Sequence, residues 1–426
     1  MIGCNGPSPL FNPLTDSSPL AGLELLAGPL GLFAFLPLVP IVRRVARTHP
    51  RCAVIGAAVV WMLATIGPAG LVIVSAAITA GFVWIAVLGT LRRRGTLGRR
   101  MMVALVWLGL HALALPFWWF PQAVSYGWDL ANPVRSPVLH WVGLAYLLLR
   151  FVAWGVDWAS KPDDRLRPAD TLTWLFYPPC MRLGPVLLRT SFLQRFDAWD
   201  PRAALPWKEI ARRFGRMLLG GVLLAVLAKN MPQVSGHAAD FFSAPRDYPT
   251  THLLRIVYFV PIQVYLFLWT YNQLAFATAL WLGVRVDDNF NWLPKATSIR
   301  DFWRRWHITV GAWLRNYVYI PLGGNRGFIP LNYAAVFGYC ALWHGASWSF
   351  VAWGMTQATG LVIQGWWDRG RAALGWTGRP SGPLWTAACW LFTMHYQIGT
   401  IVVFADFDHL GSRILPELAR RLFALD

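Results

Sequence analysis

Long apolar runs decide the fold of this chain, and residues 252–284 form the clearest of them, HLLRIVYFVPIQVYLFLWTYNQLAFATALWLGV. Within this stretch Arg255 is the one charged residue. The hydrocarbon core of a bilayer is about 30 Å thick, and about 20 helical residues cross it. Residues 252–284 are longer than one straight span needs, so we predict either a long tilted helix or a broken pair of helices.

Further apolar runs occur along the whole chain. They lie at about 21–42, 52–67, 69–91, 101–120, 137–158, 214–229, 333–367 and 384–405. The stretch Gly67-Pro68-Ala69-Gly70 separates two of these runs and is a turn signal. The run at 333–367 is too long for one span and too short for two, which predicts broken or re-entrant helices. We therefore predict an all-α, polytopic integral membrane protein with about 9–11 transmembrane helices plus re-entrant or interfacial helices.

The amino-acid composition excludes an ordinary soluble enzyme. Of the 426 residues, 56% are hydrophobic and 14% are charged, whereas soluble globular proteins carry about 25% charged residues. The 26 tryptophans and 25 phenylalanines also exclude a disordered chain. The five cysteines are scattered and form no CxxC pair, so neither a structural zinc site nor a disulfide framework is predicted.

The net charge of +18 reflects the loops between the apolar runs. Basic residues gather at 43–51, 92–100, 160–213, 285–326 and 369–379, whereas 121–136 and 230–251 hold one arginine each. Basic loops face the cytoplasm, which predicts a multi-pass protein of the cell inner membrane with an extracytoplasmic N-terminus. No nucleic-acid-binding motif is visible, so the lipid bilayer is the expected partner and nucleic acid is not.

The pattern of runs and loops divides the chain into four parts. We predict an extracytoplasmic polar tail at 1–20, N-terminal transmembrane helices at 21–135, a core at 136–405 and a C-terminal tail at 406–426. Two basic stretches, 171–196 and 299–328, mix aromatic residues with arginines, as interfacial or re-entrant segments do. Non-helical backbone at membrane depth needs protein or a water-filled cavity around it. These stretches therefore predict an internal cavity that opens to the cytoplasm.

Histidines within or beside apolar runs are the candidate catalytic groups. His344 lies in the middle of the run at 333–367, His307 lies in the stretch 299–328, and His395 lies in the last run. The ordinary pKa of histidine, near 6.5, suits a general base at neutral pH. No GxSxG, HExxH or Walker-type motif is present. From position alone, catalysis and simple packing both remain open for His344 and His307, whereas packing is favoured for His395.

Three stretches of sequence resemble a known family. Residues 300–309 read RDFWRRWHIT, residues 313–326 read WLRNYVYIPLGGNR, and residues 342–354 read LWHGASWSFVAWG. They closely resemble the membrane-bound O-acyltransferase family, in the bacterial branch that includes alginate O-acetyltransferases and teichoic-acid D-alanyltransferases. Weaker matches lie at 176–185 and 289–291, and the resemblance covers roughly residues 140–405.

The resemblance implies a reaction and a set of site residues. A short acyl group such as acetyl would move from a cytoplasmic thioester, acyl-CoA or an acylated carrier protein, to a hydroxyl of an extracytoplasmic polysaccharide or an intermediate carrier. His344 would be the catalytic base in a central membrane tunnel, and His307 would assist it or shape the cytoplasmic entrance. Other implied substrate-binding residues are Trp303, Arg304, Arg305, Arg315, Asn316 and Trp343. The implied partners are the acyl donor and a glycan or polysaccharide-modifying protein; no metal and no tightly bound cofactor are expected.

The chain departs from the family pattern in two places. Members of the bacterial branch carry Asp-Phe-Ser-Gly-Tyr-Ser-Asp before the first histidine motif, whereas residues 267–273 here read FLWTYNQ and keep only Tyr271. The last run ends in IVVFA at 401–405, without the usual Trp-x-Phe-Phe-Arg. Two alternatives therefore stay open: a transporter or flippase of polysaccharide precursors whose histidines gate protons, and an inactive acyltransferase-like scaffold.

Overall fold

The computed structural model is built from helices. It describes residues 29–95, 98–114, 144–160, 167–181, 183–230, 245–345, 348–376, 382–405 and 413–423, and these ranges contain helices, turns and loops but no strand. The all-α prediction is confirmed. The predicted tail at 1–20 lies outside the described residues.

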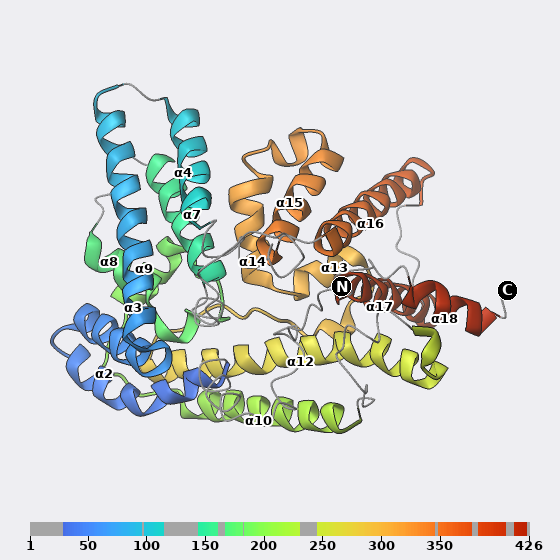
Figure 1. Ribbon diagram of the computed structural model, residues 1–426, viewed down its shortest axis with the longest axis horizontal. Helices are drawn as coiled ribbons and strands as arrows, with labels where there is room; N and C mark the ends of the chain where they lie inside the picture. The colour runs from blue at the N-terminus through green and yellow to red at the C-terminus, as the bar shows by residue number, and fades with distance from the viewer. Residues whose placement is uncertain are drawn as a thin grey trace, which may run out of the picture.

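The N-terminal helices stand side by side (Figure 1). After η1 (Pro29–Leu38) and α2 (Val39–Ala46) come α3 (Pro50–Arg93), α4 (Arg99–Ala114) and α7 (Leu144–Ser160). Helix α3 runs straight through Pro68, so the predicted turn at residues 67–70 is wrong. A proline removes one backbone hydrogen bond, but an apolar segment in lipid has no water to satisfy the remaining groups and keeps them paired within the helix.

A buried arginine holds the aromatic stretch that follows α7. This stretch forms α8 (Pro168–Leu175), η3 (Pro178–Cys180) and α9 (Arg189–Asp197). The Arg150 guanidinium, from α7, donates to the carbonyl oxygens of Leu175 at 2.9 Å and Trp174 at 3.3 Å, and also to that of Cys180. The stretch expected at the membrane interface is therefore covered by protein at Trp174 and Cys180, which are fully buried.

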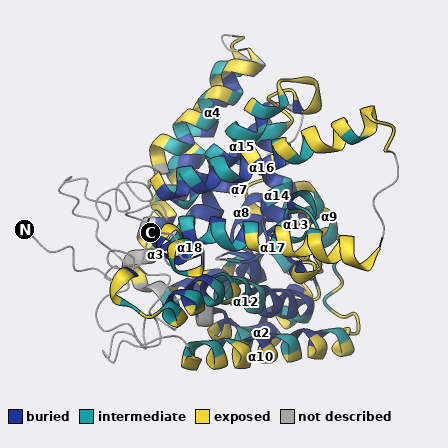
Figure 2. Ribbon diagram, turned by 90° about the vertical axis from the view of Figure 1, so that its right-hand side faces the viewer, coloured by how far each residue is buried: buried dark blue, intermediate teal, exposed yellow. Residues whose placement is uncertain are grey.

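Two long helices, α10 (Trp207–Asn230) and α12 (Thr250–Leu282), pack against each other along the lower edge of Figure 1; a short turn of helix, η4 (Pro245–Asp247), precedes α12. The opening run thus forms one long helix, and α12 ends where Gly283 takes a left-handed conformation with φ of 100°. Figure 2 shows exposed residues along the outer side of α10. These include Leu218, Leu219, Val222, Leu223 and Val226, an apolar face suited to lipid.

The C-terminal half carries the two histidine motifs on short helices and broken helices. Its elements are η5 (Leu293–Lys295), α13 (Ile299–Arg305), α14 (Ile308–Leu314), the π-helix η6 (Arg315–Tyr319), η7 (Gly324–Arg326), α15 (Ile329–His344), α16 (Trp348–Ala373), α17 (Pro383–Ala405) and α18 (Ile414–Phe423). The run at 333–367 is broken after His344, as predicted.

Three of the described helices are long and apolar enough to cross a membrane, namely Val74–Arg92 within α3, α12, and Pro383–Phe404 within α17. Pro50–Thr65 and Arg100–Leu113 are shorter apolar segments. These helices give the chain the character of a membrane protein. The count of about 9–11 spans remains a prediction, because several of the apolar runs lie partly outside the described residues.

Candidate active site

His307 sits at the junction of two short helices. It follows α13 and caps the start of α14 with a left-handed backbone, φ 45°, a conformation that is costly for a residue with a side chain and persists where its surroundings fix it. The backbone here is paired with the segment around Asn289, because the Ile308 N–H donates to the Asn289 carbonyl at 3.0 Å. The imidazole is buried between the rings of Phe290 and Trp306.

The Asn289 side chain determines which nitrogen of His307 carries the proton. Its Oδ1 accepts from the Thr309 N–H at 3.1 Å and from the Thr309 hydroxyl at 2.9 Å. The amide oxygen is therefore identified by two donors, and its Nδ2 faces His307 Nδ1 at 3.1 Å. An amide NH₂ can only donate, so Nδ1 of the neutral ring is the acceptor. The proton is on Nε2, which makes His307 a hydrogen-bond donor on its far side.

The Thr309 hydroxyl extends this arrangement to a distant segment. It accepts from the Val186 N–H at 2.9 Å while it donates to Asn289. Val186 lies in the Leu183-Gly184-Pro185 region that was a weaker motif match. Three separated pieces of sequence thus converge on one imidazole, and the arrangement leaves His307 little freedom to rotate.

His344 ends α15 at the break in the long apolar run. Its ring lies among the rings of Trp343, Phe350, Trp353 and Phe404, with centroid distances of 4.8, 6.0, 5.5 and 5.0 Å. The residue is half-buried, and its ring nitrogens have no hydrogen-bond partner within the described part of the chain. Its lone pair is therefore free to accept a proton from a substrate that reaches it.

The two histidines belong to one region of the fold. An aromatic cluster connects their surroundings. The centre of the Trp303 ring, on α13, lies 4.9 Å from the centre of the Phe337 ring and 6.1 Å from that of the Trp353 ring. The Trp353 ring in turn contacts the His344 ring. Each histidine lies where one helix stops and the next begins, so a substrate could approach both rings without passing through a helix.

A buried amide network beside this region was missed by the sequence analysis. The Trp303 indole N–H donates to Gln357 Oε1 at 3.0 Å, and Gln357 Nε2 donates to Gln397 Oε1 at 2.9 Å and to the Thr400 hydroxyl at 2.8 Å. These bonds join α13, α16 and α17; Gln357, Gln397 and Thr400 are almost wholly buried, and Trp303 is partly buried. Glutamines inside apolar runs were the available signal, because polar groups at such depth are costly unless they are paired.

The other predicted substrate-binding residues occupy different environments. Arg304 and Arg315 are exposed and have no acidic partner among the described residues. Arg305 is held by Asp301 at 3.0 Å and by the Asn291 carbonyl at 3.2 Å. The indole of Trp343 donates to the Ala145 carbonyl at 3.1 Å and packs on Tyr146. Asn316 is half-buried in the π-helix.

In the segment 267–273, which departs from the family pattern, Gln273 contacts an arginine of α10. Gln273 Oε1 accepts from Arg213 at 3.2 Å, and Arg213 forms a two-pronged pair with Asp288 at 2.6 and 2.8 Å. The Arg213 guanidinium also lies 3.8 Å from the centre of the Phe276 ring. Asp288 directly precedes Asn289, which is the hydrogen-bond partner of His307. The Arg213–Asp288 ion pair therefore anchors the backbone beside Asn289.

Residues 101–405 match the model of MBOAT, the membrane-bound O-acyltransferase family. The chain belongs to the membrane-bound O-acyltransferase family. It is 40% identical to a probable alginate O-acetylase AlgI from Pseudomonas aeruginosa over 290 residues, which are 64% of this chain and 54% of that protein.

More distant members of the membrane-bound O-acyltransferase family are also similar to the chain. A peptidoglycan O-acetyltransferase from Helicobacter pylori is 30% identical over 198 residues, 46% of this chain and 37% of that protein. A teichoic acid D-alanyltransferase from Streptococcus thermophilus is 22% identical over 295 residues, 63% and 69% of the two chains. The chain spans about half the length of the alginate O-acetylases that it matches.

Proposed function

We propose that this protein is a membrane-embedded O-acyltransferase. It moves a short acyl group such as acetyl from a cytoplasmic thioester, carried by CoA or by a carrier protein, to a hydroxyl of an extracytoplasmic polysaccharide or an intermediate carrier. The observation that carries the proposal is the pair of histidines at helix breaks. His344 has no hydrogen-bond partner among the described residues, and His307 is held at Nδ1 by Asn289. Membership in the membrane-bound O-acyltransferase family and the names of its relatives support the reaction class.

The two rings divide the chemistry between them. His344 accepts the proton of the acceptor hydroxyl as the oxygen attacks the acyl carbon, which is general-base catalysis. The negative charge then develops on the former carbonyl oxygen, and the Nε2–H of His307 is a fixed donor that can stabilise it. The carbon–sulfur bond breaks, and the thiolate takes the proton back from His344. The products are an O-acyl ester and a free thiol.

Charge distribution suggests how the reactants reach the site. The basic loops face the cytoplasm in the proposed orientation, with an extracytoplasmic N-terminus in the inner membrane. The exposed Arg304 and Arg315 lie on the histidine-bearing segment and suit the phosphates of a CoA or carrier-bound donor. The acceptor approaches from the other face, by itself or through a polysaccharide-modifying partner protein, so the thioester never crosses the membrane.

A His344→Ala variant tests the proposal in cells. The measurement is mass spectrometry of the surface polymers, with acyl ester and total polymer counted separately. Loss of the ester with unchanged polymer is the expected result. Loss of the polymer itself would indicate transport of a precursor, and an unchanged ester would indicate a scaffold; both results contradict the proposal.

A His395→Asn variant provides the matched control. His395 also lies on an apolar helix, but its Nδ1 bonds the Leu391 carbonyl at 2.8 Å and its Nε2 bonds the Tyr258 hydroxyl at 3.1 Å. Its ring is engaged in packing between α12 and α17, so its replacement leaves the acyl ester in place.

A further inference from the structure

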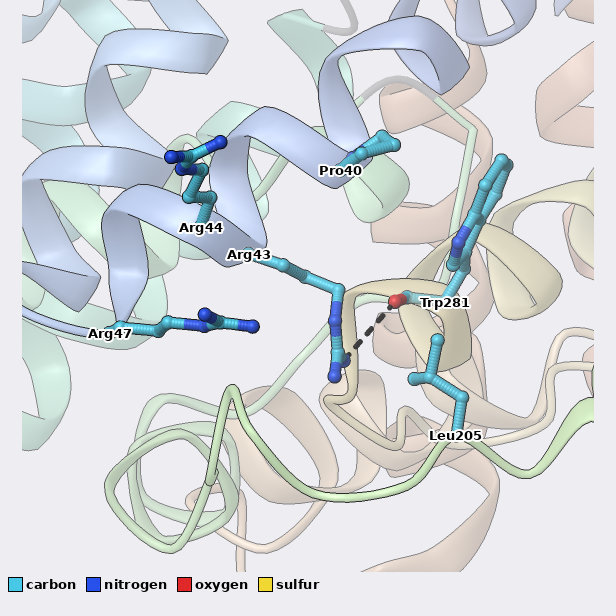
Figure 3. Close-up of a pocket in the computed structure, with 6 residues that line it drawn as sticks. All are labelled: Pro40, Arg43, Arg44, Arg47, Leu205 and Trp281. Carbon is cyan, nitrogen blue, oxygen red and sulfur yellow. Dashed lines mark hydrogen bonds between the residues drawn. The ribbon is translucent and has the colours of Figure 1, made fainter.

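A pocket lies at the base of the N-terminal helices, apart from the histidines. It has a volume of about 400 Å³ and is lined by Pro40, Arg43, Arg44, Arg47, Leu205 and Trp281. These residues come from α2, from the loop before α10 and from the last turn of α12 (Figure 3). None of the residues implicated in acyl transfer lines it, so the pocket calls for an explanation of its own.

One of its three arginines holds the fold together. Arg43 donates through one guanidinium nitrogen to the carbonyl oxygens of Trp281 at 3.4 Å and Leu282 at 3.1 Å. Through the other it donates to those of Pro201 at 2.8 Å and Ala203 at 3.0 Å. Four carbonyls thus accept from its two terminal nitrogens, and the carbonyl end of α12 is the negative end of the helix dipole. Arg43 therefore joins α2 to α12, and the donors of its terminal nitrogens are used within the protein.

The other two arginines carry charge that the described residues do not neutralise. Arg51, farther along the same segment, is paired with Asp170 and Asp197, whereas Arg44 and Arg47 are exposed and have no acidic partner in the described ranges. In Figure 3 the Arg47 guanidinium points toward that of Arg43. The pKa of Arg43 is lowered by burial first and by the charge of Arg47 second, while Asp200 partly offsets the effect.

The opposite wall of the pocket is apolar. Trp281 and Leu205 are half-buried, and the ring of the exposed Trp207 lies 6.3 Å from that of Trp281. A ligand that fits both walls has an anionic group for the arginines and an apolar or aromatic body for the tryptophans. Arginine forks match the oxygens of phosphate groups, and basic pockets between helices on the cytoplasmic side bind lipid head groups.

We propose that this pocket binds the phosphate group of an anionic ligand at Arg47, with Trp281 and Leu205 packed against the body of that ligand. The Arg44 guanidinium, which points away from Arg47 in Figure 3, adds positive charge beside the pocket. Two sources supply this chemistry, the head group of an anionic phospholipid and the phosphates of a soluble nucleotide such as coenzyme A. The proposal concerns binding alone and does not rest on acyl transfer.

The test uses the purified full-length protein in neutral detergent and two probes. One probe is phosphatidylglycerol, with phosphatidylcholine as the uncharged comparison; the other is coenzyme A. Retained ligand is counted by native mass spectrometry and by the ligand-induced rise in melting temperature. Arg44→Gln combined with Arg47→Gln removes the two free charges without touching the bonds of Arg43. Arg94→Gln combined with Arg100→Gln removes the same charge from another basic loop and is the control.

The expected result is binding of one probe to the wild type and the control, weakened about tenfold or more in the R44Q/R47Q variant. Weakened phosphatidylglycerol binding identifies a lipid site, and weakened coenzyme A binding identifies a nucleotide site. Equal binding of both probes by all three proteins would overturn the proposal, and so would an equal loss in both double variants. Because binding is read without acyl transfer, this outcome is independent of the His344 experiment.

Discussion

At the scale of single residues, the proton on His307 is fixed by the side chain of Asn289. The two bonds from Thr309 to Asn289 Oδ1 leave the amide NH₂ to face His307 Nδ1. The ring therefore carries its proton on Nε2. In the proposed mechanism this makes His307 a hydrogen-bond donor and leaves proton abstraction to His344.

Asn289→Asp tests this assignment. A carboxylate still accepts from Thr309, so the protein is expected to fold. It cannot donate to His307 Nδ1 and instead accepts from it, which moves the ring proton and turns Nε2 into an acceptor. We expect acyl transfer to fall about 100-fold, the cost of losing one oxyanion donor, with the melting temperature nearly unchanged. Full activity in this variant would show that the tautomer of His307 is unimportant.

Asn289→Leu separates positioning from stability. This change also removes the acceptor of the buried Thr309 N–H, and a buried donor without a partner costs about 1–3 kcal/mol. We expect the free energy of unfolding to fall by about that amount in addition to the loss of transfer. Chemical denaturation in detergent measures it; a stability equal to that of Asn289→Asp would contradict the proposed role of Oδ1.

At the scale of elements, the packing of α15 on α16 sets the position of His344. A Cβ added at Gly354, on α16, would lie 2.5 Å from the Phe337 carbonyl oxygen and 3.1 Å from the Ala341 Cβ, both on α15. Neither group can rotate away. The close approach of the two helices therefore depends on the absence of a side chain at residue 354.

Gly354→Ala is accordingly expected to push α15 outward and move His344. Overpacking of this kind lowers the free energy of unfolding by about 1–3 kcal/mol. We expect the loss of acyl transfer to be larger than the loss of folded protein can explain. The control is Gly221→Ala on α10, where an added Cβ meets nothing within 4 Å. Activity assays and melting curves on both variants check the prediction, and equal behaviour of the two would refute the packing argument.

The C-terminal helix α18 is held by a carboxylate and three arginines. Glu417 bonds Arg420 at 3.0 Å and Arg421 at 2.6 Å and lies 3.4 Å from Arg246; Arg421 also donates to the Tyr248 carbonyl at 2.7 Å. Hydrogen bonds from Arg420 and then Arg421 lower the pKa of Glu417 from 4.5 to about 2. Arg420 and Arg421 lie on α18 itself, so the lowered pKa means that these bonds stabilise α18 fully above about pH 4.5 and that the stabilisation is lost as the pH falls toward 2.

Hydrogen exchange of residues 413–423 measures this dependence. We expect protection at neutral pH that decreases below pH 4.5 in the wild type. In Glu417→Gln, protection is weak at every pH, because the amide cannot neutralise the arginines. A protected α18 in that variant would show that apolar contacts such as those of Ile414 and Leu418 hold the helix without the charge.

At the scale of the whole molecule, the apolar runs predicted the fold class, and some elements escaped prediction for physical reasons. The break after His344 could be predicted, because 333–367 was too short to cross twice and Gly345 follows the histidine. The continuity of α3 through Pro68 could not, because a proline signals a turn in water and is tolerated in lipid.

In the candidate site, residues within a continuous motif could be predicted, whereas partners that are distant in sequence could not. The motifs identified His307 and His344, because each histidine lies in a continuous stretch of sequence that resembles the family. The roles of Asn289 and Gln357 depend on contacts with Thr309, 20 residues away, and with Gln397, 40 residues away. Such partners are set by tertiary packing, so composition and periodicity could only mark them as polar residues in or beside apolar surroundings.

The central claim is that the protein, with His344 as general base, transfers an acyl group between reactants on opposite faces of the membrane. The most direct measurement uses inverted membrane vesicles that enclose the acceptor polymer, with isotopically labelled acetyl-CoA supplied outside. We predict labelled ester on the enclosed polymer with the wild type, none with His344→Ala, and thiol release outside in step with ester formation. Labelled ester at the wild-type rate in the His344→Ala vesicles would contradict the account.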